Sequence, residues 1–139
     1  KKKKKDNPSS LTLRVSYGGR QILLTGDLEG AGLKKLLSEP TTDRVDVLLS
    51  PHHGSRSANT RDLNEWAKPA YVIVSGGQKQ TIPELNKIYS ENVQIYSTRQ
   101  HGAITCLIDK AGHLKVTPFR GDRSCSDSPG QDSNSISTD

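Results

Sequence analysis

The sequence is short of the residues that mark several classes of protein. It has no methionine, two cysteines and six aromatic residues among 139 positions. Its aliphatic runs stop at three residues, as in 72–74. A membrane-spanning helix needs about 20 apolar residues and a signal peptide an apolar region of about 7–15, so neither is expected. Cys106 lies in an apolar stretch and Cys125 in a polar one, which argues against a disulfide framework.

The missing methionine also bears on the extent of the chain. Translation starts with methionine and this chain opens on Lys1, so we expect a processed product or part of a longer one. A length of 139 residues allows one domain, and 31% hydrophobic with 25% charged residues fits a small core with polar ends. We therefore expect a basic segment over 1–6, a folded body over 7–120 and a disordered polar tail over 121–139.

The formal net charge of +5 is unevenly distributed. Residues 1–6 carry +4, residues 7–119 carry +3 and residues 120–139 carry −2. The five lysines at 1–5 are either a solvated terminus, as charge blocks usually are, or a segment that binds nucleic acid or an anionic surface through counterion release.

Hydrophobic periodicity predicts strands and helices in alternation. We expect strands over 11–15, 21–25, 45–50, 71–75, 93–96, 103–108 and 114–117, and helices over 28–38, 60–67 and 82–89. The first strand alternates as a half-buried strand does, Thr60 is an expected N-cap, and Pro83 suits a first helical turn. This order, bracketed by hairpins, predicts an α/β fold with a mixed sheet and flanking helices.

Two motifs follow apolar strands directly. Asp27 comes after Gly26 at the end of one strand, and His52-His53 comes before Gly54 at the end of another. Ligands of open α/β sheets bind at this edge, and carboxylate with imidazole suits zinc, manganese or iron. Taken alone, Asp27 is also compatible with a turn or helix cap, and the histidine pair with exposed turn residues.

Other candidates for chemistry are weaker. His101 and His113 are expected to be surface turn residues. Ser55 lacks the Gly-x-Ser-x-Gly setting of a serine nucleophile, and Cys106 has no basic neighbour in sequence to activate it. The pair Gly76-Gly77 is a weak signal for an anion site.

The order of the motifs carries a family resemblance. The runs are SLTLRVSYGGRQILLTGDLEG, VDVLLSPHHGSRS, KPAYVIVSGG, IPELNKIY and STRQHGAI. Together they resemble the C-terminal half of a metallo-β-lactamase-fold hydrolase, in the branch of the ComEC-type DNA-uptake proteins. The resemblance covers about residues 7–119 and implies half of an αββα sandwich, with one or two zinc ions, or manganese or iron, at the sheet edges.

The resemblance also implies roles for particular residues. Asp27 is the bridging carboxylate between two metals, and one histidine of the pair is a ligand of the second metal. We favour His53, because Gly54 lets the backbone approach the site, and His52 then supports the site or faces the substrate; the choice stays open. Ser55 and Arg56 lie at the pocket rim, where Arg56 can hold a phosphate oxygen.

The resemblance also concerns residues with a structural role and ligands that this sequence lacks. Asn7 and Ser9 or Ser10 match the start of the family's strand pair, where their role is structural. The family's His-x-(His or Asp)-x-Asp-His segment is absent, and Ile82 stands where relatives commonly have a further histidine. We therefore expect an upstream half of the same domain to complete the site.

Two functions follow as expectations. The first is metal-dependent hydrolysis of a phosphodiester or related ester, as a nuclease on DNA during uptake. The second is a degenerate, non-enzymatic module that binds nucleic acid through its basic surface. The compartment is open between the cytosol and the exported face of a bacterial membrane protein.

Overall fold

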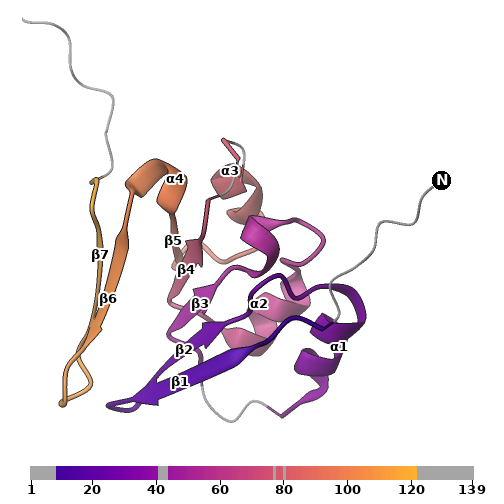
Figure 1. Cartoon of the computed structure of the whole chain (residues 1–139), viewed down its shortest axis with the longest axis horizontal. Coiled ribbons are helices and arrows are strands. Elements are labelled where there is room, and N and C mark those ends of the chain that lie inside the picture. Colours follow the sequence, from indigo (N-terminus) through magenta and orange to yellow (C-terminus); the bar gives the residue numbers. More distant parts are fainter. Residues whose placement is uncertain (1–8, 41–43, 77, 80, 122–139) are drawn as a thin grey trace, which may run out of the picture.

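The centre of the molecule is a five-stranded mixed sheet (Figure 1). The computed structural model describes residues 9–40, 44–76, 78–79 and 81–121. The strands lie in chain order: β1 Leu13–Tyr17, β2 Arg20–Leu24, β3 Val47–Leu49, β4 Tyr71–Val74 and β5 Gln94–Ser97. The β1–β2 hairpin is antiparallel, and β2 to β5 are parallel. The α/β fold with a mixed sheet and flanking helices is confirmed, and the predictions for 1–6, Asn7 and 122–139 lie outside the described residues.

Three helices pack against one face of this sheet. They are α1 Gly30–Ser38, α2 Arg61–Ala67 and α3 Thr81–Leu85. The core between them and the sheet is made of aliphatic side chains, among them Leu33, Leu63 and Leu85 from the helices and Leu23, Leu48, Val72 and Val74 from the strands. Burying one such side chain stabilises the fold by about 1.5–3 kcal/mol, so this small core fixes the strand positions.

Local sequence explains where α2 begins and ends. The Thr60 hydroxyl accepts a hydrogen bond from the Leu63 backbone N at 3.2 Å, which confirms the expected N-cap. At the other end Lys68 is left-handed and its N–H bonds to the Asn64 carbonyl, which closes the last turn.

The opposite face of the sheet is apolar and open to solvent. A row of residues in register crosses all five strands: Leu13, Leu24, Leu49, Ile73 and Tyr96. Leu13 is 52% exposed, and the other four are partly exposed. Successive side chains of a strand point to opposite faces, so this row faces away from the helices.

The expectation of a half-buried first strand was wrong. Every residue of β1 is exposed, including Val15 and Tyr17. β1 is an edge strand, and its apolar side faces the open side of the sheet. Its polar side is exposed too, although Arg14 lies over the ring of Trp66, 5.6 Å from the centroid.

A second, two-stranded sheet follows the first. It consists of β6 Ile104–Ile108 and β7 Leu114–Pro118, as the sequence predicted. Its turn contacts the turn of the first hairpin, where Arg20 Nε donates to the Gly112 carbonyl at 2.7 Å. Gly18 is required at this contact, because a Cβ there would lie 2.8 Å from the Asp109 carbonyl oxygen.

Helical content at the end of β5 was not predicted. A single turn, α4 Thr98–His101, connects β5 to β6. It buries His101, which is 2% exposed, so its assignment as a surface turn residue was wrong. The ring packs edge-to-face on Tyr96 at 5.2 Å, and its Nδ1 lies 3.1 Å from the Ser97 backbone N. His113 is exposed in the β6–β7 turn, as expected.

Candidate functional site

The two sequence motifs meet at one edge of the sheet. Because β2, β3 and β4 are parallel, their carboxyl ends meet there. Gly26-Asp27 follows β2, the tight turn η1 Pro51–Gly54 follows β3, and Ser75 follows β4. The His52 backbone N donates to the Gly26 carbonyl at 2.9 Å and ties the two motifs together.

The backbone of η1 is unusual at both histidines. His52 has φ 50° and His53 φ 54°, in the left-handed region. This conformation costs a residue with a Cβ roughly 1–2 kcal/mol, and it persists where surrounding contacts hold it. The fold therefore imposes this geometry on the histidine pair.

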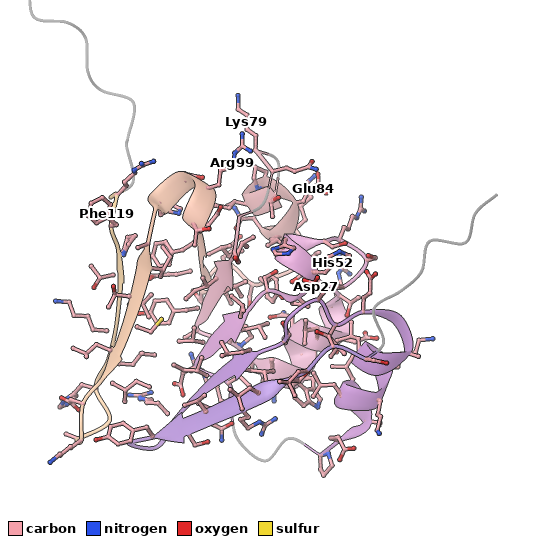
Figure 2. The ribbon with its side chains drawn as sticks, viewed as in Figure 1. Asp27, His52, Lys79, Glu84, Arg99 and Phe119 are labelled. Atoms are coloured by element: carbon pink, nitrogen blue, oxygen red, sulfur yellow. The ribbon has the colours of Figure 1, made fainter. Side chains whose placement is uncertain are left out.

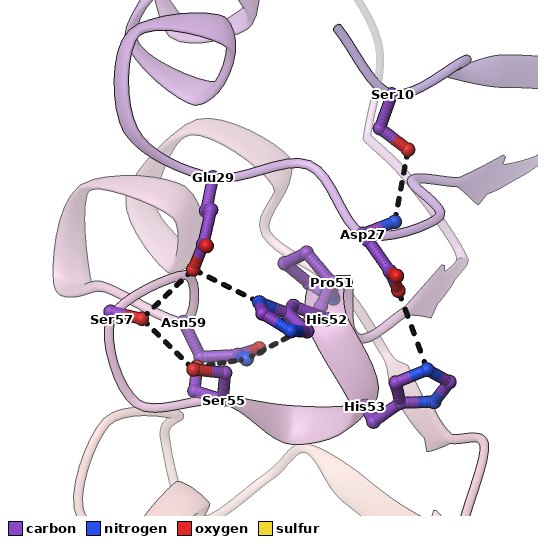
Figure 3. Close-up of polar contacts among 9 residues, drawn as sticks. All are labelled: Ser10, Asp27, Glu29, Pro51, His52, His53, Ser55, Ser57 and Asn59. Atoms are coloured by element: carbon purple, nitrogen blue, oxygen red, sulfur yellow. Dashed lines mark hydrogen bonds and ion pairs between the residues drawn. The ribbon is translucent and has the colours of Figure 1, made fainter. Parts of the chain in front are cut away.

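His53 points at Asp27. Its Nδ1 lies 2.9 Å from the Ser75 carbonyl oxygen, which can only accept, so Nδ1 carries the proton of that hydrogen bond. In the neutral ring Nε2 then holds a lone pair, and it lies 3.4 Å from Asp27 Oδ1 (Figure 3). In a metal-binding histidine, the ring nitrogen that does not bind the metal commonly donates a hydrogen bond to a carbonyl or carboxylate oxygen.

Asp27 is fixed by its backbone. Its N–H donates to Ser10 Oγ at 2.9 Å, which gives Ser10 the structural role expected for Ser9 or Ser10. Gly26 allows this contact, because its φ is +53° and a Cβ there would lie 2.5 Å from Ser10 Oγ.

The spacing of this pair suits a metal ion. When two ligand atoms bind one metal ion at about 2.1 Å each and at a tetrahedral angle, the two ligand atoms lie about 3.4 Å apart. Asp27 Oδ1 and His53 Nε2 are separated by 3.4 Å, and their side chains are 47% and 60% exposed. Within the described ranges no group of three or more His, Cys, Asp or Glu side chains could hold a metal. The pair thus offers two donors and leaves room for others.

His52 has a different partner. Its Nδ1 lies 3.0 Å from Glu29 Oε2, and the Glu29 side chain is 5% exposed. Ser57 Oγ donates to the same carboxylate oxygen at 3.1 Å. The structure brings His53, and not His52, to Asp27; whether either histidine binds a metal stays a prediction.

Glu29 was not singled out from the sequence. It stands two residues after Asp27 and is the N-cap residue of α1, where its side chain makes no capping bond. No sequence signal marks it, because its burial and its contact with His52 depend on the folded turn at 51–55.

A pocket of about 510 Å³ lies beside the histidines. Its lining residues are His52, His53, Gly54, Ser55, Arg56, Gln78, Thr81 and Glu84. Ser55 and Arg56 are among these lining residues, and their role in binding a substrate stays a prediction. Ser55 Oγ lies 2.9 Å from Ser57 Oγ, which links the pocket wall to Glu29.

The charges around this pocket are mixed. Arg56 Nη1 lies 3.8 Å from Glu84 Oε2, and Lys87 Nζ donates to Glu84 Oε1 at 2.9 Å. The Lys87 ammonium holds the pKa of the Glu84 carboxyl below its usual value, first by this hydrogen bond and then by its charge. Lys79 and Arg99 are exposed at the same end of the molecule (Figure 2). Of these cations Arg56 lines the pocket itself, and Lys79 and Arg99 lie near it without lining it.

Comparison with known proteins gives relatives of one kind. No protein-family model matches the sequence. The chain is 29% identical over 103 residues to ComE operon protein 3 of Bacillus subtilis (strain 168), covering 70% of this chain and 13% of that protein. It is 27% identical over 124 residues to competence protein ComA of Neisseria gonorrhoeae, covering 82% and 18%. It is also 33% identical over 73 residues to recombination protein 2 of Haemophilus influenzae (strain ATCC 51907 / DSM 11121 / KW20 / Rd), covering 52% and 9%.

These relatives support the competence part of the resemblance. The chain spans less than a fifth of the length of each of them. They do not bear on the metallo-β-lactamase fold or on catalysis. Across the part of the chain that the structure describes, no helix is long and apolar enough to span a membrane.

Proposed function

We propose that this chain forms part of a metal-dependent hydrolase of phosphodiester or related ester bonds, acting as a nuclease in DNA uptake. The observation that carries this proposal is the separation of 3.4 Å between Asp27 Oδ1 and His53 Nε2 beside the pocket. Zinc, as one or two ions, suits this donor set best, with manganese or iron as alternatives.

The protein's own groups prepare the site. The Ser75 carbonyl directs the lone pair of His53 outward, and Ser10 fixes the backbone that carries Asp27. A metal held there supplies Lewis-acid activation of water and stabilises developing negative charge. Arg56, at the mouth of the pocket, is placed to hold a phosphate oxygen through charge-assisted hydrogen bonds.

The remaining ligands must come from elsewhere. The described residues offer two donors, whereas a catalytic zinc site takes three protein ligands and an open position. We propose that an upstream half of the same domain supplies them and packs on the open face of the sheet, forming the αββα sandwich. The apolar row from Leu13 to Tyr96 supports this, since stacked sheets bury such side chains between them.

The link to DNA uptake has separate support. By name, one relative is a competence protein, one is a ComE operon protein and one is a recombination protein. Arg56 lines the pocket and Arg99 is exposed at the same end of the molecule, and cations there suit a phosphodiester.

The test uses the full-length protein. We expect Asp27→Ala to lose bound metal and phosphodiesterase activity together. Asp109→Ala is the matched control, because Asp109 is an exposed carboxylate beside a histidine, in the β6–β7 turn. Unchanged metal content and activity in Asp27→Ala would overturn the assignment.

A nucleic-acid-binding module without hydrolysis is the second candidate. The net charge of +5 and the exposed side chains of Arg56, Lys79 and Arg99 favour it. It predicts DNA binding that falls steeply with salt and survives a chelator. Chelator-sensitive cleavage, with binding that is insensitive to salt, argues against it.

A further inference from the structure

Asn59 is the most completely bonded polar side chain behind the histidine pair. It is 1% exposed and lies just before α2. Its Nδ2 donates to the Ser55 carbonyl at 2.8 Å and to the Pro51 carbonyl at 3.2 Å. Its Oδ1 accepts from Ser50 Oγ at 2.8 Å and from Tyr89 OH at 2.9 Å. All four hydrogen-bonding positions of the amide are used.

The orientation of this amide is determined by its neighbours. The Pro51 and Ser55 carbonyls can only accept, so the Nδ2 group must face them, and Oδ1 then faces the two hydroxyls. Burial raises the pKa of the Tyr89 phenol, which therefore stays a neutral donor at physiological pH. The backbone of Ser50, which carries this Oγ, is held in place because the Ser50 N–H donates to the Ile73 carbonyl at 2.8 Å.

The two bonds from Nδ2 bracket the histidines. Pro51 precedes them and Ser55 follows Gly54, so one side chain ties both ends of the segment that carries the two left-handed residues. Left-handed backbone is unfavourable for two residues that carry a Cβ, so it persists where contacts hold it. The two hydrogen bonds from the buried amide are such contacts.

We infer that Asn59 is a positioning residue: it holds the turn through Pro51 and Ser55 and thereby sets the direction of the His53 ring. We call its two Nδ2 hydrogen bonds the Asn59 clamp. Without the clamp the turn relaxes, the contact of His53 Nδ1 with the Ser75 carbonyl is lost, and His53 Nε2 no longer faces Asp27. The link to catalysis rests on the proposed function, whereas the geometric statement does not.

The histidine tautomer reports on this clamp directly. Long-range nitrogen–proton NMR of the chain near pH 8.5, about two units above the usual histidine pKa, shows which ring nitrogen carries the proton. We expect His53 to be protonated on Nδ1 in the unaltered chain. In Asn59→Asp, which keeps the shape and removes both donors, we expect the mixed tautomers of an exposed ring.

Two controls separate positioning from loss of folding. Tyr89→Phe removes a bond to Oδ1 but leaves both Nδ2 donors, so the His53 tautomer is expected to stay on Nδ1. His113, whose Nδ1 lies 2.8 Å from Asp109 Oδ2 in a distant turn, should give the same signal in all variants.

The outcomes are distinct. An Asn59→Asp chain that is folded by its backbone spectrum and keeps His53 on Nδ1 overturns the inference. If that variant does not fold, hydrogen exchange of the Asn59 side-chain amide in the unaltered chain decides: protection supports the clamp, and exchange at the rate of a free amide overturns it. A confirmed clamp with no metal bound to the full-length protein would instead contradict the proposed function alone.

Discussion

Gly54 is the residue whose substitution tests the packing behind the site most sharply. It has φ +80°, and a Cβ there would collide with the Thr81 methyl and lie 3.1 Å from Val74 Cγ1. Val74 is fully buried in the core, so displacing it disturbs the packing around it. Gly54→Ala therefore carries two costs, left-handed strain of about 1–2 kcal/mol and overpacking of about 1–3 kcal/mol.

Gly19 isolates the first cost. Its φ is +73° and a Cβ there meets nothing within 4 Å, so Gly19→Ala pays for strain only. In urea unfolding, with a slope of roughly 1–2 kcal/mol per molar, the overpacking cost of about 1–3 kcal/mol should place the midpoint of Gly54→Ala about 0.5–3 M below that of Gly19→Ala. Equal midpoints would refute the close packing of η1 against β4 and α3.

Three further substitutions test particular contacts. Burial raises the pKa of Tyr89 above its usual value near 10, so above pH 10 Tyr89 ionises more readily in the unfolded chain than in the folded one. The protein should therefore lose stability as the pH rises above 10. Tyr89→Phe should remove that part of the loss, as measured by urea unfolding at pH 9 and 11. Thr60→Ala should cost about 1 kcal/mol by losing the N-cap of α2, and no change in unfolding free energy would contradict the cap. Burial also raises the pKa of the Cys106 thiol, so in a Cys125→Ser background iodoacetamide should react slowly at pH 7.5 and rapidly in urea; equal rates would show that the thiol is accessible.

Much of the fold follows from local sequence patterns. The turn at Gly18-Gly19, the cap at Thr60 and the alternation in β6 and β7 depend on neighbours in sequence, and these elements were predicted within a few residues. The meeting of Asp27 with the histidine pair followed from two apolar strands that both end in polar motifs. The general rule about the carboxyl ends of parallel strands was enough to expect it.

What was missed depends on contacts between distant residues. The exposure of β1 is set by what packs on a whole sheet face, which no strand pattern reports. His101 is buried because α4 turns it toward Tyr96. Glu29 acquires its role only through the folded turn at 51–55, 22 or more residues away in the chain, and Asn59 is held in its place by Tyr89, 30 residues away.

Metal content of single-histidine variants tests the central claim most directly. The full-length protein, His53→Ala, His52→Ala and the control His113→Ala are purified in zinc-containing buffer, and bound metal is counted by mass spectrometry. The account predicts bound zinc in the unaltered protein and in His113→Ala, and its loss in His53→Ala. Retention of the full zinc content in His53→Ala would contradict the pairing of His53 with Asp27 as metal ligands.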